Sequence, residues 1–259
     1  ITALTTEIVH YAAERACTVR VTLKREGEAE PMALFGKTYC EGEGEPTWQA
    51  MQALWQSDGR VREQLLIPQP LAFQPESNTI WQFALSGKTL LECDDGSESF
   101  YELLEKAGAA IAALHRCDLS GLSQLGIADV ISRLESAEQL IATVCPQHRQ
   151  TLNSLVGRLI MAAKQIGERP LATLHGDLHL KNFFVTDDRI VQVGLIDLDN
   201  LHCGDPWQDV GSFAAAIHCQ GLIEGKTFDH REQIVRRFAD AYRSNARYEF
   251  SDAALNWHT

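Results

Sequence analysis

The chain has 259 residues, of which 45% are hydrophobic and 22% charged, and its formal net charge is -12. This apolar content excludes a disordered chain, and no apolar run approaches the ~20 residues that a membrane-spanning helix needs. The acidic average field repels a phosphate polyanion, which argues against nucleic acid as a partner. We expect a globular protein without a membrane or nucleic-acid partner, and nothing in the sequence implies a protein partner.

The seven cysteines are scattered and include no C-x-x-C pair. This usage is typical of reduced thiols in a cytoplasmic protein rather than of a disulfide framework or a zinc ribbon. The first residues also lack the apolar core of a secretory signal, so we expect a cytoplasmic location. Because the chain starts at Ile1 rather than Met and ends within a helical pattern, we expect that one or both ends are trimmed.

The first 86 residues predict mainly strands. Alternating polar and apolar positions in 18–24 and 32–39, with a polar turn between them, predict an antiparallel hairpin. Pro46 suits the first turn of a helix that Asp58 and Gly59 would close. Two further extended segments are predicted, at 67–73 and 79–85.

From about residue 100 the apolar spacing changes to that of helices. Helices are predicted at 100–115, 130–144, 151–166, 208–220 and 227–246. A section of short strands with clustered His and Asp interrupts them at 171–208. Strands first and helices afterwards predict an α+β protein with two lobes, divided as 1–86 and 87–259.

The interrupting section carries the candidate chemistry. Asp177 and Asn182 are separated by four residues, and a turn at 186–189 joins two apolar runs that predict a hairpin. That hairpin would return Asp197 to the side of Asn182, giving two hard oxygen ligands suited to Mg²⁺. Asp177 remains as a separate carboxylate that can accept a proton from an attacking hydroxyl, with the spacing of the protein kinase catalytic loop.

Three motifs in this order, H-G-D-L-H-L-K-N, I-D-L-D and G-D-P-W-Q-D, resemble those of the aminoglycoside phosphotransferase / choline kinase-like family of small-molecule kinases. The resemblance implies a bilobal protein-kinase-like fold with ATP between a β-rich lobe and a mainly helical lobe. It also implies that Asp177 is the catalytic base and that His175 braces the catalytic loop. Asn182 and Asp197 would hold Mg²⁺, and Asp209 would make structural hydrogen bonds below the loop.

The same resemblance makes Lys37 the strand-borne lysine that reaches the nucleotide phosphates, oriented by a carboxylate of the next helix. Gln49 stands where that glutamate is expected, and Glu45 lies one turn earlier as a substitute. A glycine-rich loop is also missing, because residues 12–18 have the sequence A-A-E-R-A-C-T.

The adenine ring would stack near the strand at 80–85. Its expected contacts are backbone atoms of Gln82, Phe83 and Ala84. Two other residues keep two interpretations each: Asp199 is a second carboxylate near Mg²⁺ or the cap of the following turn, and His179 is a substrate contact or a variable position. Asp205, which precedes Pro206, favours a turn and cap role.

The predicted activity is ATP- and Mg²⁺-dependent transfer of the γ-phosphoryl group to a hydroxyl of a small molecule. The acidic surface is compatible with an amine-bearing acceptor, as are Asp177, Asp199, Asp205 and Trp207.

Three alternatives remain. The missing glycine loop and Gln49 favour a degenerate nucleotide-binding protein without turnover. The D-x-H sequence at Asp177 and His179 fits a two-metal phosphatase, but the Asn-His pair that such a site also needs is missing. A protein kinase is disfavoured because the D-F-G and A-P-E anchors are absent from the sequence.

Overall fold

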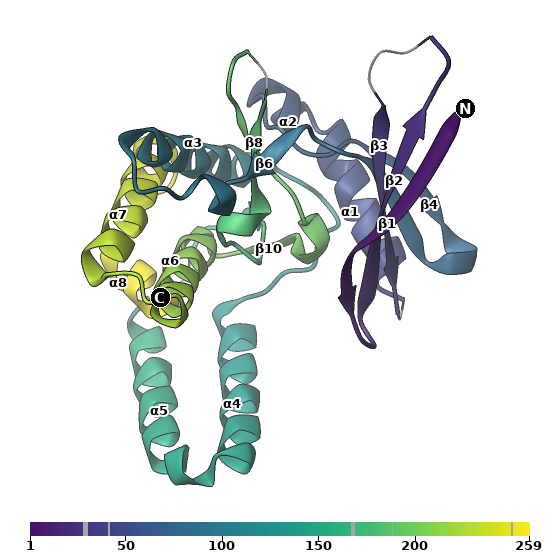
Figure 1. The fold of residues 1–259 in the computed structure, drawn as a ribbon. Coiled ribbons are helices and arrows are strands. Elements are labelled where there is room, and N and C mark those ends of the chain that lie inside the picture. Colours follow the sequence, from purple (N-terminus) through teal and green to yellow (C-terminus); the bar gives the residue numbers. More distant parts are fainter. Residues whose placement is uncertain (28–30, 41, 167–168, 188, 250) are drawn as a thin grey trace.

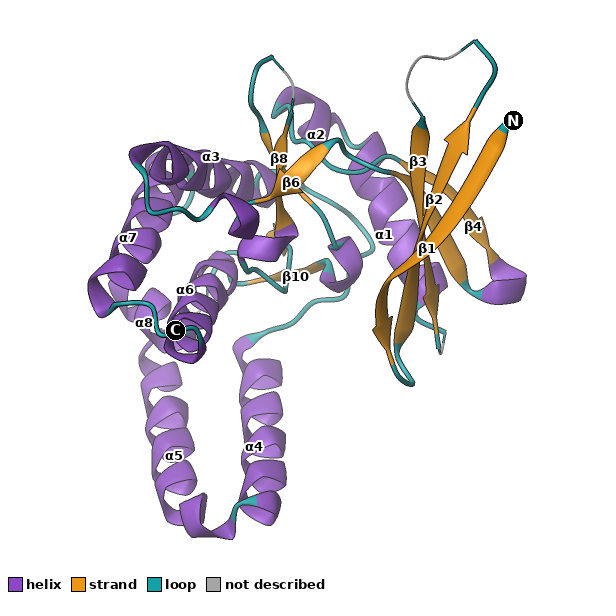
Figure 2. Cartoon of the chain, in the orientation of Figure 1, coloured by secondary structure: helices purple, strands orange, loops and turns teal. Residues whose placement is uncertain are grey.

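The N-terminal lobe is built on a five-stranded antiparallel sheet, seen edge-on at the right of Figures 1 and 2. The computed structural model describes residues 1–27, 31–40, 42–166, 169–187, 189–249 and 251–259. The sheet has the order β1-β2-β3-β5-β4. Its strands are β1 (Ala3–Ala12), β2 (Ala16–Lys24), β3 (Met32–Tyr39), β4 (Pro70–Gln74) and β5 (Thr79–Phe83), with η1 (Pro75–Ser77) between the last two.

The predicted hairpin is present as β2 and β3, in a register that pairs Thr18 with Lys37. Helix α1 (Gly44–Gln56) follows and contacts β4 and β5. The expectation that Asp58 and Gly59 close this helix is wrong, because they begin a second helix, α2 (Asp58–Arg62). Ser57 has an extended backbone and its Oγ accepts from the Arg60 amide at 3.0 Å, so it caps α2 instead of continuing α1.

The C-terminal lobe is mainly helical. Its long helices are α3 (Glu98–His115), α4 (Ile127–Val144), α5 (Arg149–Ile166), α6 (Pro206–Ile223) and α7 (Phe228–Asn245), followed by α8 (Asp252–His258). Helix α3 packs along α7 over an aromatic core in which the rings of Phe213 and Phe238 stack at 4.0 Å. Phe183 meets both rings edge-on. Because Phe183 is the first residue of a short strand, this aromatic core anchors that strand to the helices.

Two small sheets carry the loops between the lobes. One has the order β6-β8-β9, from β6 (Gly87–Thr89), β8 (Phe183–Thr186) and β9 (Val193–Leu195). The other pairs β7 (Ala172–Leu174) with β10 (His202–Gly204). Short turns of helix complete the lobe: η2 (Leu91–Cys93), η3 (Pro146–His148), η4 (Leu180–Asn182) and η5 (Leu198–Asn200). The hairpin predicted beyond Asn182 is therefore present as β8 and β9.

The lobes also meet at β9. The amide of Leu195 donates to the carbonyl oxygen of Leu66, in the segment before β4, at 2.9 Å. A Cβ on Gly194 would lie 2.7 Å from that same oxygen, so only glycine permits the approach.

Helices α4 and α5 form a hairpin that projects from the body of the C-terminal lobe (Figure 1). Over the described residues, none of the helices has the length and apolar character required to cross a bilayer. The division of the lobes at residues 86 and 87 stays a prediction.

Candidate active site

Asp209 holds the catalytic loop that follows β7. Its side chain is fully buried and accepts the amides of His175 at 2.8 Å and Gly176 at 2.9 Å. His115 Nε2 donates to the same carboxylate at 3.0 Å, and His115 Nδ1 lies 2.8 Å from the Tyr242 hydroxyl. Burial alone would raise the pKa of Asp209, but the hydrogen bonds outweigh it and the pKa is lowered. Asp209 is therefore a buried anion that fixes the backbone just before Asp177.

The other end of the loop is braced by His175, which is fully buried. Its Nε2 donates to the carbonyl oxygen of Ile196 at 2.9 Å, which joins the catalytic loop to the residue before Asp197. Gly176 adopts φ +81°, and a Cβ there would collide with the Asn200 carbonyl oxygen. The turn before Asp177 therefore requires glycine.

The hairpin places Asn182 beside the segment that carries Asp197. Phe183 pairs with Leu195, and the Ile196 amide donates to the Asn182 carbonyl oxygen at 3.0 Å. The Asn182 side-chain amide donates to the Asp177 carbonyl oxygen at 2.8 Å, which leaves the side-chain oxygen for another partner. Asn182 thus links the candidate base to the candidate metal ligand.

Asp197 lies in the left-handed region, with φ 59° and ψ 59°. This conformation is costly for a residue with a side chain and is found mainly where the surroundings hold a functional group in place.

Asn182 and Asp197 offer one amide oxygen and one carboxylate. Within the described residues there is no group of three or more His, Cys, Asp or Glu side chains that could hold a metal ion on its own. Mg²⁺ is commonly bound by one or two carboxylates together with substrate phosphates and waters. The donor set therefore fits Mg²⁺ delivered with a nucleotide and does not fit a zinc or two-metal site.

Lys37 reaches across from β3 to this same segment. Its Nζ lies 2.7 Å from Asp197 Oδ1 and 2.5 Å from Asp199 Oδ2. Burial alone would lower the pKa of Lys37, but the two carboxylates outweigh it and raise the pKa. The Tyr39 hydroxyl donates to Asp199 Oδ1 at 2.8 Å, and burial next to Asp199 raises the pKa of this tyrosine. A solvated strand-end lysine would show none of these contacts.

The expected helix carboxylate does not meet Lys37. Gln49 and Glu45 are both exposed on α1, and the ion pairs of Lys37 within the described residues are those with Asp197 and Asp199. Asp199 was expected to be either a second carboxylate near Mg²⁺ or the cap of the following turn. Both of its side-chain oxygens contact residues of β3, so it does not cap the turn.

The segment expected to contact adenine already uses two of its amides. Phe83 donates to the Gln69 carbonyl oxygen and Ala84 to the Ala33 carbonyl oxygen, both at 3.0 Å. Leu85 is the next amide along the chain, and it makes no hydrogen bond within the described residues. Gln82 sits in the strand ladder opposite Phe35. In this segment the Leu85 amide is thus a backbone donor that remains for a ligand.

His179 lies beside Asp177, whereas Asp205 lies at the start of α6. His179 Nε2 is 3.9 Å from Asp177 Oδ2, and burial lowers the pKa of His179. Asp205 caps α6, accepting the Trp207 amide at 3.1 Å, and it pairs with His258 at 3.4 Å. Asp205 therefore stabilises the C-terminal helices and does not face the catalytic loop.

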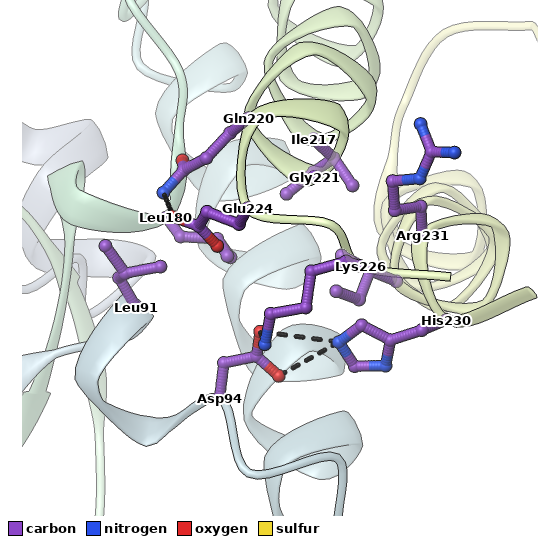
Figure 3. Close-up of a pocket in the computed structure, with 11 residues that line it drawn as sticks. Leu91, Asp94, Leu180, Ile217, Gln220, Gly221, Glu224, Lys226, His230 and Arg231 are labelled. Atoms are coloured by element: carbon purple, nitrogen blue, oxygen red, sulfur yellow. Dashed lines mark hydrogen bonds and ion pairs between the residues drawn. The ribbon is translucent and has the colours of Figure 1, made fainter. Parts of the chain in front are cut away.

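A small pocket lies between η2, η4 and the turn from α6 to α7 (Figure 3). Its volume is about 20 Å³, room for about one water molecule, so it is not the acceptor pocket. Asp94 bridges it by contacts of 3.1 Å to His230 and 3.1 Å to Lys226, which tie α7 to the segment after β6.

Sequence reasoning missed Tyr39 and the route by which His175 reaches Ile196. Tyr39 had a signal, because alternation along a strand places it on the same face as Lys37. The contact of His175 with the Ile196 carbonyl oxygen had no signal in the sequence, because every residue type carries a backbone carbonyl group.

Comparisons with known proteins identify the family and the fold. Residues 49–250 match the model of the phosphotransferase enzyme family. A search of curated proteins finds no match. The structure is similar to an aminoglycoside-3'-phosphotransferase of type VIII, with a TM-score of 0.66, 16% identity, and coverage of 98% of this chain and 91% of that one.

Two further solved structures share the fold. An aminoglycoside phosphotransferase from Streptomyces rimosus, solved with ADP and streptomycin, has a TM-score of 0.60 and 16% identity over 90% of this chain and 89% of that one. A choline kinase from Streptococcus pneumoniae has a TM-score of 0.56 and 16% identity over 98% of this chain and 90% of that one.

Proposed function

The chain belongs to the phosphotransferase enzyme family, and on that premise we propose that it is a small-molecule kinase that uses ATP and Mg²⁺ and phosphorylates a hydroxyl group. The observation that carries the proposal is the meeting of Lys37 with Asp197 beside Asn182, on the loop that bears Asp177. Phosphoryl transfer needs a cation that binds phosphates, two oxygen ligands for Mg²⁺, and a separate carboxylate that acts as the base.

Each residue has one task in this proposal. Asn182 and Asp197 would hold Mg²⁺, which neutralises charge on the phosphates when bound. Lys37 binds the phosphates from the other side of the cleft. Asp177 orients the acceptor hydroxyl and takes its proton as the bond to the γ-phosphoryl group loosens. His175 and Asp209 keep the loop in place through contacts to its backbone.

Nucleotide binding is supported by the Streptomyces rimosus phosphotransferase, which was solved with ADP. In this chain the adenine would lie against the segment from Gln82 to Leu85. The Leu85 amide would donate to it, because the amides of Phe83 and Ala84 are already paired.

The acceptor is proposed to be a small molecule, and an amine-bearing one agrees with the net charge of -12. Of the four residues named from the sequence as compatible with such an acceptor, the structure leaves one that can face it. Asp199 and Asp205 are engaged with other side chains, and Trp207 is fully buried, so these three do not face an acceptor. Asp177 is half-exposed and is the acid left to contact it. A cytoplasmic location and the lack of a protein partner stay predictions from the sequence.

The test is Mg²⁺-dependent ATP turnover with amino sugars, choline-like amines, sugars and homoserine as acceptors. Asp177→Asn is expected to lower turnover about 10²–10⁴-fold while Mg·ATP binding is kept, because it removes the base and leaves the metal ligands. Asp229→Asn, an exposed change on α7, is the matched control. Nucleotide binding without turnover for any acceptor would instead support the degenerate protein, and ATP-independent hydrolysis of phosphomonoesters would support the phosphatase.

A further inference from the structure

We propose that Asp199 is the positioning residue for Lys37, taking the place of the carboxylate expected on α1, and that Tyr39 holds Asp199 in its orientation. The proposal deepens the proposed function and rests on it, because Lys37 needs positioning only if it binds phosphates. It assigns Asp199 a role that is neither of the two considered from the sequence, a second carboxylate near Mg²⁺ or a turn cap.

The contacts of Asp199 are directed entirely at β3. One oxygen lies 2.5 Å from Lys37 Nζ, and the other accepts the Tyr39 hydroxyl at 2.8 Å. The side chains of Lys37 and Asp199 are 24% and 22% exposed, so the pair is shielded from most of the solvent that weakens surface ion pairs. Both oxygens of Asp199 therefore already have a partner on β3, and each keeps one further acceptor site.

The strand explains why two residues of β3 reach one acid. Side chains two residues apart point to the same face of a sheet, so Lys37 and Tyr39 approach Asp199 together. Asp199 is carried by η5, which contacts α1. It therefore enters the space between sheet and helix from the C-terminal lobe, whereas Gln49 and Glu45 face solvent.

Asp197 cannot do this task once a nucleotide is bound. Asp197 Oδ1 lies 2.7 Å from Lys37 Nζ, but Asp197 is also the proposed metal ligand. Asp197 would hold Mg²⁺, and an acid shared with a divalent ion would attract the Lys37 ammonium group less strongly. Asp199 then remains as the acid that keeps Lys37 near the phosphates.

The test is a double-mutant cycle on nucleotide affinity, measured by calorimetry with Mg·ADP so that no acceptor and no turnover are needed. Asp199→Asn is expected to raise Kd roughly tenfold, the size of a lost hydrogen bond between charged groups. On the Lys37→Met background the same change is expected to alter Kd by less than about twofold, because Asp199 acts through Lys37. Tyr39→Phe is expected to raise Kd about threefold, again only when Lys37 is present.

Asp229→Asn and Tyr11→Phe are the matched controls, since both residues are exposed and lie outside the site. Circular dichroism and urea unfolding identify any variant that does not fold, in which case Tyr39→Phe alone decides. An unchanged Kd, or a loss that persists on the Lys37→Met background and shrinks as Mg²⁺ is raised, overturns the proposal and makes Asp199 a metal ligand or a bystander. A wild-type chain that binds neither Mg·ADP nor Mg·ATP refutes the proposed function itself, and this proposal with it.

Discussion

The replacement of Asp209 by asparagine tests how much of the active-site structure depends on one buried carboxylate. Asp209 receives three donors: the amides of His175 and Gly176 and the ring Nε2 of His115. Two of them share Oδ2, so an asparagine oxygen placed there keeps two bonds while its NH₂ group faces the Gly176 amide. At least one buried N–H is then unpaired, and the two surviving bonds lose their charge assistance.

The cost follows from these contacts. An unsatisfied buried amide costs about 1–3 kcal/mol, and each bond to a neutral instead of a charged acceptor loses about 1 kcal/mol, so Asp209→Asn should lower the free energy of unfolding by about 3–5 kcal/mol at pH 7. Urea unfolding followed by circular dichroism measures this difference, with Asp229→Asn expected to change it by less than about 0.5 kcal/mol.

The pH dependence has a definite sign. Because the folded-state pKa of Asp209 is lowered, its contribution is present above the ordinary carboxyl pKa and is lost as pH falls through the folded-state value. The difference between wild type and Asp209→Asn should therefore be complete at neutral pH and shrink below about pH 4. A difference under about 1 kcal/mol at pH 7, or one that grows in acid, would refute the assignment of Asp209 as a buried anion.

Three other substitutions test separate parts of the structure. Gly176→Ala should cost at least about 1–2 kcal/mol of stability, measured by urea unfolding, because its backbone is left-handed and the Asn200 carbonyl blocks a Cβ; no loss would contradict this turn geometry. Asp197→Ala should abolish the thermal stabilisation by Mg·ATP, and survival of that shift would mean that the metal ligand is misassigned. Glu63→Gln, at the partly exposed pair with Arg116, should cost less than about 1 kcal/mol in urea unfolding, and a larger loss would mean that solvent screens this pair less than we infer.

Much of the fold was predictable because periodicity reports which face of an element is buried. The β2–β3 hairpin, the long helices and the β8–β9 hairpin agree with the expectations within a few residues. Strand β1 did not stand out, since nearly all of its side chains are exposed and no buried stripe marks it.

The candidate site was predictable where its residues are close in sequence. Asn182 and Asp197 flank the β8–β9 hairpin, whose pairing brings their segments together, and Asp177 lies five positions before Asn182. The partner of Lys37 was not predictable, because Asp199 is 162 positions away (199 − 37) and is brought to β3 only by the packing of the two lobes. The family pattern pointed to Gln49 on α1, which is exposed, whereas the ion pairs of Lys37 within the described residues are with Asp197 and Asp199.

The contact of Leu66 with β9 has a consequence for how the cleft can open. The predicted lobes meet at several places: the chain passes between them near residues 86 and 87, the Leu195 amide donates to the Leu66 carbonyl oxygen, and Glu63 pairs with Arg116. These contacts involve none of the candidate site residues, whereas the ion pairs of Lys37 cross the site itself. Opening of the site for a nucleotide would therefore require release of the Lys37 ion pairs and could leave the contacts of Leu66 and Glu63 in place.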